Sequence, residues 1–116
     1  MNGRPVRFAW LLVLVPVLWW RPSALPAGAY RVTVLDVGQG LAVVVETRRR
    51  VLVFDTGPAW RSGRDAGAAV VVPFLRGAGI EQVDALVLSH GDGDHRGGAA
   101  SIEQRIRVDR RWVGPD

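Results

Sequence analysis

Four side chains of the kinds that bind metal ions lie close together in the stretch Ser-His-Gly-Asp-Gly-Asp-His-Arg-Gly-Gly at 89–98. They are His90, Asp92, Asp94 and His95. Imidazole and carboxylate together are typical ligands of zinc, manganese or iron. His90 and Asp92 are two residues apart, so in an extended loop they point the same way, whereas the adjacent Asp94 and His95 diverge. The pattern predicts two neighbouring metal positions, which together would bind water and a phosphoryl or acyl oxygen.

These candidate ligands directly follow an apolar run at 83–88, which predicts a buried strand. They therefore emerge from the carboxyl end of a strand, onto a glycine-rich loop that precedes a helical pattern. Binding sites in open α/β sheets are built at this edge. The alternative is an acidic, glycine-rich surface turn that happens to hold two histidines. The preceding strand favours the metal site.

The rest of the chain predicts a small mixed domain of the α/β (α+β) class. Alternating and β-branched residues predict a meander of strands at 31–36, 41–46 and 51–54. Asp65 could cap a helix running to about residue 78, but we prefer a helix with Pro73 in its first turn and Gly79 as its C-cap. A helix at 98–106 and a strand from 108 follow. The arginines at 48–50 are expected to form a solvated hairpin tip rather than a phosphate site.

The metal motif resembles that of the metallo-β-lactamase fold, His-x-His-x-Asp-His, with Asp92 in place of the second histidine. In this form it is similar to the C-terminal domain of the ComEC family, the DNA-uptake channel proteins of natural competence. Two upstream segments, at 35–40 and 54–58, match the same family in order and separation. The resemblance thus covers about residues 30–114. Leu41 departs from the family pattern, which often has an acidic or small polar residue there.

The resemblance implies a metallo-β-lactamase-like αββα sandwich, of which residues 30–116 form the first, N-terminal half only. A hydrophobic membrane segment and linker, residues 1–29, would precede it. The implied activity is metal-dependent hydrolysis of single-stranded DNA, with two divalent ions and with Asp94 as the catalytic residue. Asp92 in place of histidine favours Mn²⁺ over Zn²⁺. The remaining ligands would come from the missing second half or a complementing chain, so this fragment alone should be inactive.

Two further aspartates, Asp36 and Asp55, lie at the ends of expected strands and shortly before glycines. Such carboxylates can hold a metal loop or orient a ligand histidine without binding metal. Aspartate near glycine is also ordinary turn chemistry. By resemblance we favour the supporting role for Asp55, and for Asp36 both interpretations stay open. Trp60, in the polar loop at 58–64, could stack on a base or pack on the protein body, and the sequence does not separate the two.

Two other hypotheses of function stay open. The chain could belong to a membrane-anchored or exported hydrolase of the same fold that acts on another ester or a lactam. It could instead be a non-catalytic, truncated remnant that anchors at the membrane or pairs with another chain.

The N-terminal segment is an uncharged apolar run at 8–20 behind Arg4 and Arg7. It is shorter than the ~20 residues that span a bilayer as a helix. It could be a signal-peptide core, an uncleaved anchor or the end of a longer membrane domain, and the resemblance favours the last. The leading arginines favour a cytoplasmic N-terminus, which would place the domain on the extracytoplasmic side of the inner membrane.

Composition adds little about function. The net charge of +4 suits nucleic acid and a membrane surface equally. Cysteine is absent, which excludes disulfides and thiolate metal ligands.

Overall fold

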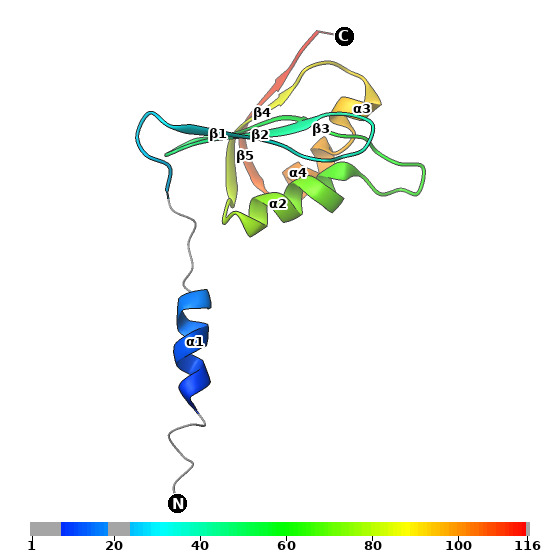
Figure 1. The fold of residues 1–116 in the computed structure, drawn as a ribbon. Helices are drawn as coiled ribbons and strands as arrows, with labels where there is room; N and C mark the ends of the chain where they lie inside the picture. Colours follow the sequence, from blue (N-terminus) through cyan, green and yellow to red (C-terminus); the bar gives the residue numbers. More distant parts are fainter. Residues whose placement is uncertain (1–7, 19–23, 116) are drawn as a thin grey trace, which may run out of the picture.

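The structure is a computed structural model and describes residues 8–18 and 24–115. A five-stranded sheet organises it, in the order β1-β2-β3-β4-β5 (Figure 1). The strands are β1 (Tyr30–Val34), β2 (Ala42–Thr47), β3 (Val51–Thr56), β4 (Gln82–Leu88) and β5 (Arg107–Val113). The first three pair antiparallel, whereas β3, β4 and β5 pair parallel. The predicted meander and the mixed α/β class are confirmed.

The hairpin between β2 and β3 is fixed to the neighbouring strand by one carboxylate. Asp84 on β4 accepts hydrogen bonds from the Val51 backbone N–H at 2.7 Å and from Arg50 Nη1 at 2.9 Å. The Val51 N–H is the main cause that lowers the pKa of Asp84, and Arg50 adds to it, while partial burial opposes the shift. Of the three arginines at this tip, Arg48 and Arg49 are exposed, as predicted, while Arg50 also serves as the partner of Asp84.

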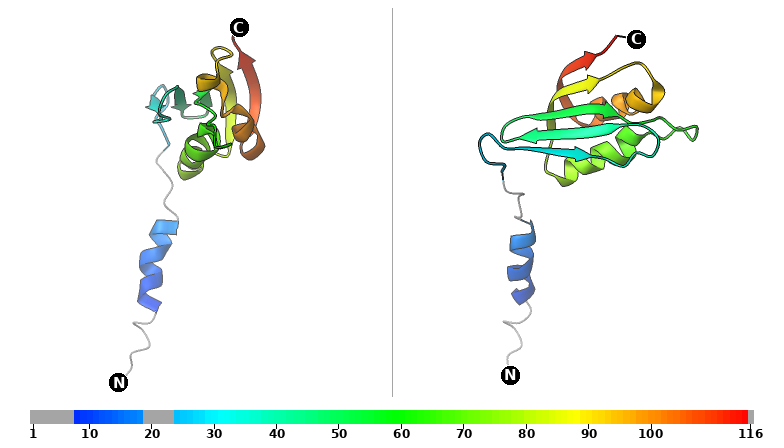
Figure 2. Two further views of the ribbon diagram at one scale, coloured as in Figure 1. Left: turned by 90° about the vertical axis from the view of Figure 1, so that its right-hand side faces the viewer. Right: turned by 45° about the horizontal axis from the view of Figure 1, so that its top comes forward.

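Helices cover one face of the sheet. The π-helix η2 (Gly67–Val71) continues into α2 (Val72–Gly77), and α4 (Ala99–Arg105) lies beside them (Figures 1 and 2). A one-turn helix, α3 (Gly93–Arg96), follows the end of β4. The largest fully buried apolar side chains of this layer and the sheet are Val44, Val53, Val71, Val72, Leu75, Val83, Leu86, Leu88 and Ile102.

The region around Pro73 differs from the sequence-based expectation. Pro73 does lie in the first turn of α2, and Gly79 follows its end with φ of +74°. Helical structure nevertheless begins earlier, with η2, and the Asp65 carboxylate accepts a hydrogen bond from the Ala68 N–H at 2.8 Å. Proline clashes with the carbonyl four residues before it in an α-helix, and the wider π-helical turn relieves this clash.

The other face of the sheet carries two rows of mostly apolar side chains, and none of them is buried. Successive cross-strand partners form the first row: Val34, Val43, Phe54, Val87 and Trp112. The second row is Val32, Val45, Leu52, Ala85 and Arg110. Val34 and Trp112 expose 67% and 59% of their surface. A sheet usually buries both faces when it contains parallel strands, so this open face is a candidate packing surface.

The N-terminal helix α1 (Ala9–Leu18) has no buried residue. The other parts of the predicted hydrophobic segment, residues 1–7 and 19–23, lie outside the described residues, and so do Arg4 and Arg7. Within the two stretches that the structure describes, we find no helix with the length and apolar character needed to cross a membrane.

Candidate metal centre

The loop after β4 carries the four predicted ligands to the carboxyl end of the parallel strands. Its second half is the one-turn helix α3, which the sequence analysis treated as loop. Asp92 precedes this turn with extended backbone angles, and its carbonyl accepts the His95 N–H at 3.1 Å. Asp94 and His95 therefore lie on a helical turn rather than on extended backbone.

Asp55, at the end of β3, holds His95 directly. Its Oδ2 lies 2.7 Å from His95 Nδ1 and accepts the Ser89 hydroxyl at 2.7 Å, and its Oδ1 accepts the Ser89 N–H at 2.8 Å. The carboxylate is fully buried, and its residue has φ of +57°, a left-handed conformation that aspartate tolerates better than most residues. Asp55 thus joins the end of β3 to both ends of the metal loop.

The hydrogen bond between Asp55 and His95 affects both the pKa and the tautomer of the His95 ring. The hydrogen bond to Asp55 raises the pKa of His95, partial burial opposes the shift, and the charges of Asp55, Asp94 and Asp92 add to it. A carboxylate can only accept, so the neutral ring keeps its proton on Nδ1. The Nε2 lone pair then faces outward, 3.8 Å from Asp94 Oδ2. A carboxylate that fixes the tautomer of a histidine in this way is the usual support of a metal ligand.

His90 and Asp92 form a second, more exposed pair beside His95. His90 Nδ1 lies 3.3 Å from Asp92 Oδ2, and the rings of His90 and His95 have centroids 4.1 Å apart. The helical turn of α3 thus places the His95 ring beside the His90 ring. That Asp94 and His95 serve a second, neighbouring metal position stays a prediction.

The donor chemistry fits a divalent cation, but the set is incomplete. Histidine nitrogen and aspartate oxygen suit manganese and zinc, and the fixed His95 ring presents a free lone pair. Yet within residues 8–18 and 24–115 no three His, Asp or Glu side chains are grouped so that they could hold an ion. A cavity of about 520 Å³ opens beside the loop, lined by His90, Gly91, Asp92 and Arg96.

Thr56 and Ser89 support the site and were missed by the sequence analysis. The buried Thr56 hydroxyl donates to the His95 carbonyl at 3.1 Å and accepts the Gly98 N–H at 3.1 Å, so it fixes the segment where α3 ends and α4 begins. The available signal was their place next to predicted site residues: Thr56 follows Asp55, and Ser89 precedes His90.

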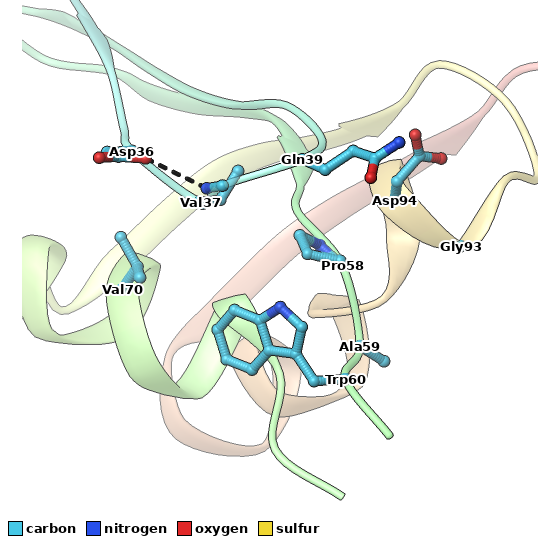
Figure 3. Close-up of a pocket in the computed structure, with 10 residues that line it drawn as sticks. Asp36, Val37, Gln39, Pro58, Ala59, Trp60, Val70, Gly93 and Asp94 are labelled. Atoms are coloured by element: carbon cyan, nitrogen blue, oxygen red, sulfur yellow. Dashed lines mark hydrogen bonds between the residues drawn. The ribbon is translucent and has the colours of Figure 1, made fainter. Parts of the chain in front are cut away.

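The loop between β1 and β2 packs against the metal loop. Gly40 has φ of +136°, and a β-carbon there would overlap the Asp94 carbonyl oxygen. The Leu41 N–H points at the same carbonyl at 3.4 Å. Asp36 has a different place: its Oδ1 accepts the Gly38 N–H at 3.1 Å, and it lines a pocket that Asp94 also lines (Figure 3). Asp55 contacts His95, then, whereas the polar partner of Asp36 belongs to its own turn.

Comparison with known proteins agrees with this geometry. Residues 35–116 match the family model of the metallo-β-lactamase superfamily, and the chain belongs to this superfamily. Its relatives include ComEC-family proteins. Competence protein ComA of Neisseria gonorrhoeae is 44% identical over 92 residues, which are 79% of this chain and 13% of that protein. Recombination protein 2 of Haemophilus influenzae is 37% identical over 95 residues, 82% of this chain and 12% of that protein.

A third relative carries a different name. Ribonuclease J of Mycobacterium tuberculosis is 32% identical over 99 residues, 80% of this chain and 17% of that protein. The chain thus spans less than a fifth of the length of these relatives. No solved structure matches the chain significantly.

Proposed function

We propose that the chain forms the metal-binding half of a metal-dependent phosphodiesterase that cleaves single-stranded DNA during DNA uptake. The observation that carries the proposal is the fully buried Asp55 carboxylate, 2.7 Å from His95 Nδ1. A carboxylate placed only to stabilise the loop has no need of a histidine as its partner. The Asp55 carboxylate leaves the His95 Nε2 lone pair beside Asp94, where a cation could bind both the nitrogen and the Asp94 carboxylate.

His90, Asp92, Asp94 and His95 would hold the metal, with Mn²⁺ or Zn²⁺ as candidates. A bound divalent cation supplies Lewis-acid stabilisation of a phosphoryl oxygen. The protein's own contribution is to fix the His95 tautomer through Asp55 and to take the proton of the attacking water at Asp94 Oδ2. Asp94 is suited to this because it is partly exposed, while the loop that carries it is clamped by Thr56.

The substrate class is supported by the relatives' names. Two of them are named for competence and recombination, and another is named as a ribonuclease. Competence requires DNA to enter a cell, and a ribonuclease cleaves phosphodiester bonds. Together they favour a phosphodiester over the alternative substrate, another ester or a lactam, which no relative described above bears in its name.

We further propose that the open face of the sheet packs against the second half of the same domain. Its two rows of side chains cross all five strands, and eight of the ten residues are aliphatic or phenylalanine. A continuous apolar surface of this kind is usually covered in the working protein. The covering half would also bring the ligands that the four residues of the loop do not supply.

The proposed location is the inner membrane, with the domain on its extracytoplasmic side. The support is the wholly apolar sequence of α1 (Ala9–Leu18), which has no buried residue, and the competence names of the relatives. Cell fractionation followed by protease treatment of spheroplasts tests this proposal. If protease removes the epitope of the domain from intact spheroplasts, the result agrees with the proposal. If the epitope is protected until the spheroplasts are lysed, the result contradicts it.

A nuclease assay tests the proposed reaction. The longest protein that the cell makes with this chain in it is purified and incubated with single-stranded DNA and Mn²⁺, and released nucleotides are measured. We expect release that depends on Mn²⁺ and is lost in Asp94→Ala. Asp109→Ala is the matched control, since Asp109 lies on β5 and pairs with Arg107 outside the site. Hydrolysis of a lactam or carboxylic ester without nucleotide release would transfer the proposal to the other substrate class, and absence of both would favour a non-catalytic remnant.

A further inference from the structure

A pocket of about 550 Å³ lies next to the metal loop and has no part in the chemistry above. Its walls come from four places: the turn after β1, the loop after β3, the helix η2 and the start of α3. Trp60, Pro58 and Val70 are on one side and Val37 and Gln39 on the other, and Asp94 stands at one end (Figure 3). A proposed metal ligand therefore also lines this second pocket.

The Trp60 indole is held on a short, well-bonded turn. The backbone N–H of Trp60 donates to the Arg64 carbonyl at 2.8 Å, and the backbone N–H of Gly63 donates back to the Trp60 carbonyl at 3.0 Å. The flanking residues Ala59 and Asp65 pair as an isolated bridge, and Asp65 is anchored in turn to Ala68 and Ser101. Such a turn can present a flat ring without a large loss of entropy when a ligand binds.

The polar end of the pocket is close to the metal loop. Figure 3 shows the Gln39 carboxamide beside the Asp94 carboxylate, with Pro58 between them and the Trp60 indole. A carboxamide can both donate and accept hydrogen bonds. The pocket thus combines Trp60, a residue that is 38% exposed, with apolar walls, the adaptable carboxamide of Gln39 and the carboxylates of Asp36 and Asp94.

We propose that this pocket binds the base of the nucleotide next to the phosphate that is cleaved. The inference rests on the proposed function, and it adds how the strand is held. Each base has a flat face that stacks on an aromatic side chain whatever its sequence. Gln39 can match different base edges by turning its amide, so the pocket would position single-stranded DNA without selecting one base. Trp60 is then a positioning residue for substrate.

Binding measurements on the 116-residue chain test the pocket separately from hydrolysis. An oligothymidylate and an abasic oligonucleotide of equal length and charge are titrated, and binding is followed by fluorescence anisotropy. We expect the base-containing strand to bind about 5- to 150-fold more tightly, the range that one stacked base contributes. Trp60→Ala should bring this ratio close to one, and Trp60→Phe should keep most of it. Gln39→Ala should reduce it about 2- to 12-fold.

Trp112→Ala is the matched control, because Trp112 lies on the open face of the sheet and not in the pocket. Its ratio should stay at the wild-type value. Equal binding of the two oligonucleotides to the wild-type chain would overturn the inference. A ratio of the two affinities that stays at the wild-type value in Trp60→Ala would overturn it as well. If the nuclease assay releases no nucleotides but the ratio of the two affinities is large and depends on Trp60, the proposed hydrolysis is refuted. The pocket then stands as a binding site for single-stranded DNA.

Discussion

Replacement of Asp55 by asparagine separates the structural role of this residue from its effect on His95. The side chain keeps its size, and asparagine adopts the left-handed backbone at φ of +57° at least as well as aspartate. The new carboxamide oxygen could still accept the Ser89 N–H, and its amide could donate to the Ser89 hydroxyl. The amide N–H would then face His95 Nδ1, which must become an acceptor. The ring proton moves to Nε2 and occupies the lone pair that faces Asp94.

The magnitudes follow from the three hydrogen bonds. Asp55→Asn loses the charge but can satisfy every donor, so we expect a loss of ~1–2 kcal/mol in the free energy of unfolding. Asp55→Ala leaves three donors without a partner and places alanine in the left-handed region, which adds to about 4 kcal/mol. For metal affinity the comparison is different, because loss of the supporting carboxylate costs about 10- to 100-fold in either variant.

Three measurements check this reasoning. Urea unfolding gives the stability, Mn²⁺ titration gives the affinity, and nitrogen NMR of the imidazole gives the tautomer of His95. Asp65→Asn is the matched control, because Asp65 also accepts a backbone N–H and a serine hydroxyl but contacts no histidine. It should lose stability and keep its metal affinity. Unchanged Mn²⁺ affinity in Asp55→Asn, with the proton still on Nδ1, would refute the argument.

Three further predictions concern the support of the site and of the sheet. Thr56→Val removes a buried hydroxyl with two partners and should cost ~2–3 kcal/mol in urea unfolding, whereas a loss below ~0.5 kcal/mol would show that the hydroxyl does not clamp the turn. Gly40→Ala should weaken Mn²⁺ binding, since its β-carbon would push on the Asp94 carbonyl, while Gly77→Ala, which meets no atom, should not. Asp84 has a lower pKa in the folded chain than the ordinary aspartate value of 3.8. Its contribution to stability is therefore complete above about pH 3.8 and is lost as the pH falls through the pKa of the folded chain. The loss in free energy of unfolding in Asp84→Asn should be constant near neutral pH and shrink below pH 3.8. A loss that grows in acid would contradict this.

The sequence predicts the parts of the fold that depend on local pattern. The strands of the meander are rich in β-branched residues, and β4 (Gln82–Leu88) contains a mostly apolar run. The position of the metal loop follows from this strand before it. Ile102 in α4 and Ile106, which follows the end of this helix in an extended conformation, are both buried in the core, as expected. Because these features depend on neighbours in the sequence, they can be inferred before any tertiary contact is known.

The features that the sequence did not predict come from tertiary packing. The hydrogen bond between Asp55 and His95 joins residues forty positions apart, and no spacing rule gives its length. The π-helical turn before Pro73 relieves the clash of the proline ring and also packs against the start of α4, where Gly67 and Gly98 meet backbone to backbone. The turn of α3 is hydrogen-bonded to Thr56 near its end, and it brings the rings of His90 and His95 together.

Pulsed electron paramagnetic resonance of Mn²⁺ bound to the chain is the most direct test of the metal centre. Nitrogen nuclei that coordinate the ion give couplings that solvated Mn²⁺ lacks. We predict imidazole nitrogen couplings in the wild-type chain, which weaken in His90→Ala and in His95→Ala. A spectrum of Mn²⁺ surrounded by water alone, at a protein concentration that saturates binding of the ion, would contradict the assignment of these histidines as metal ligands.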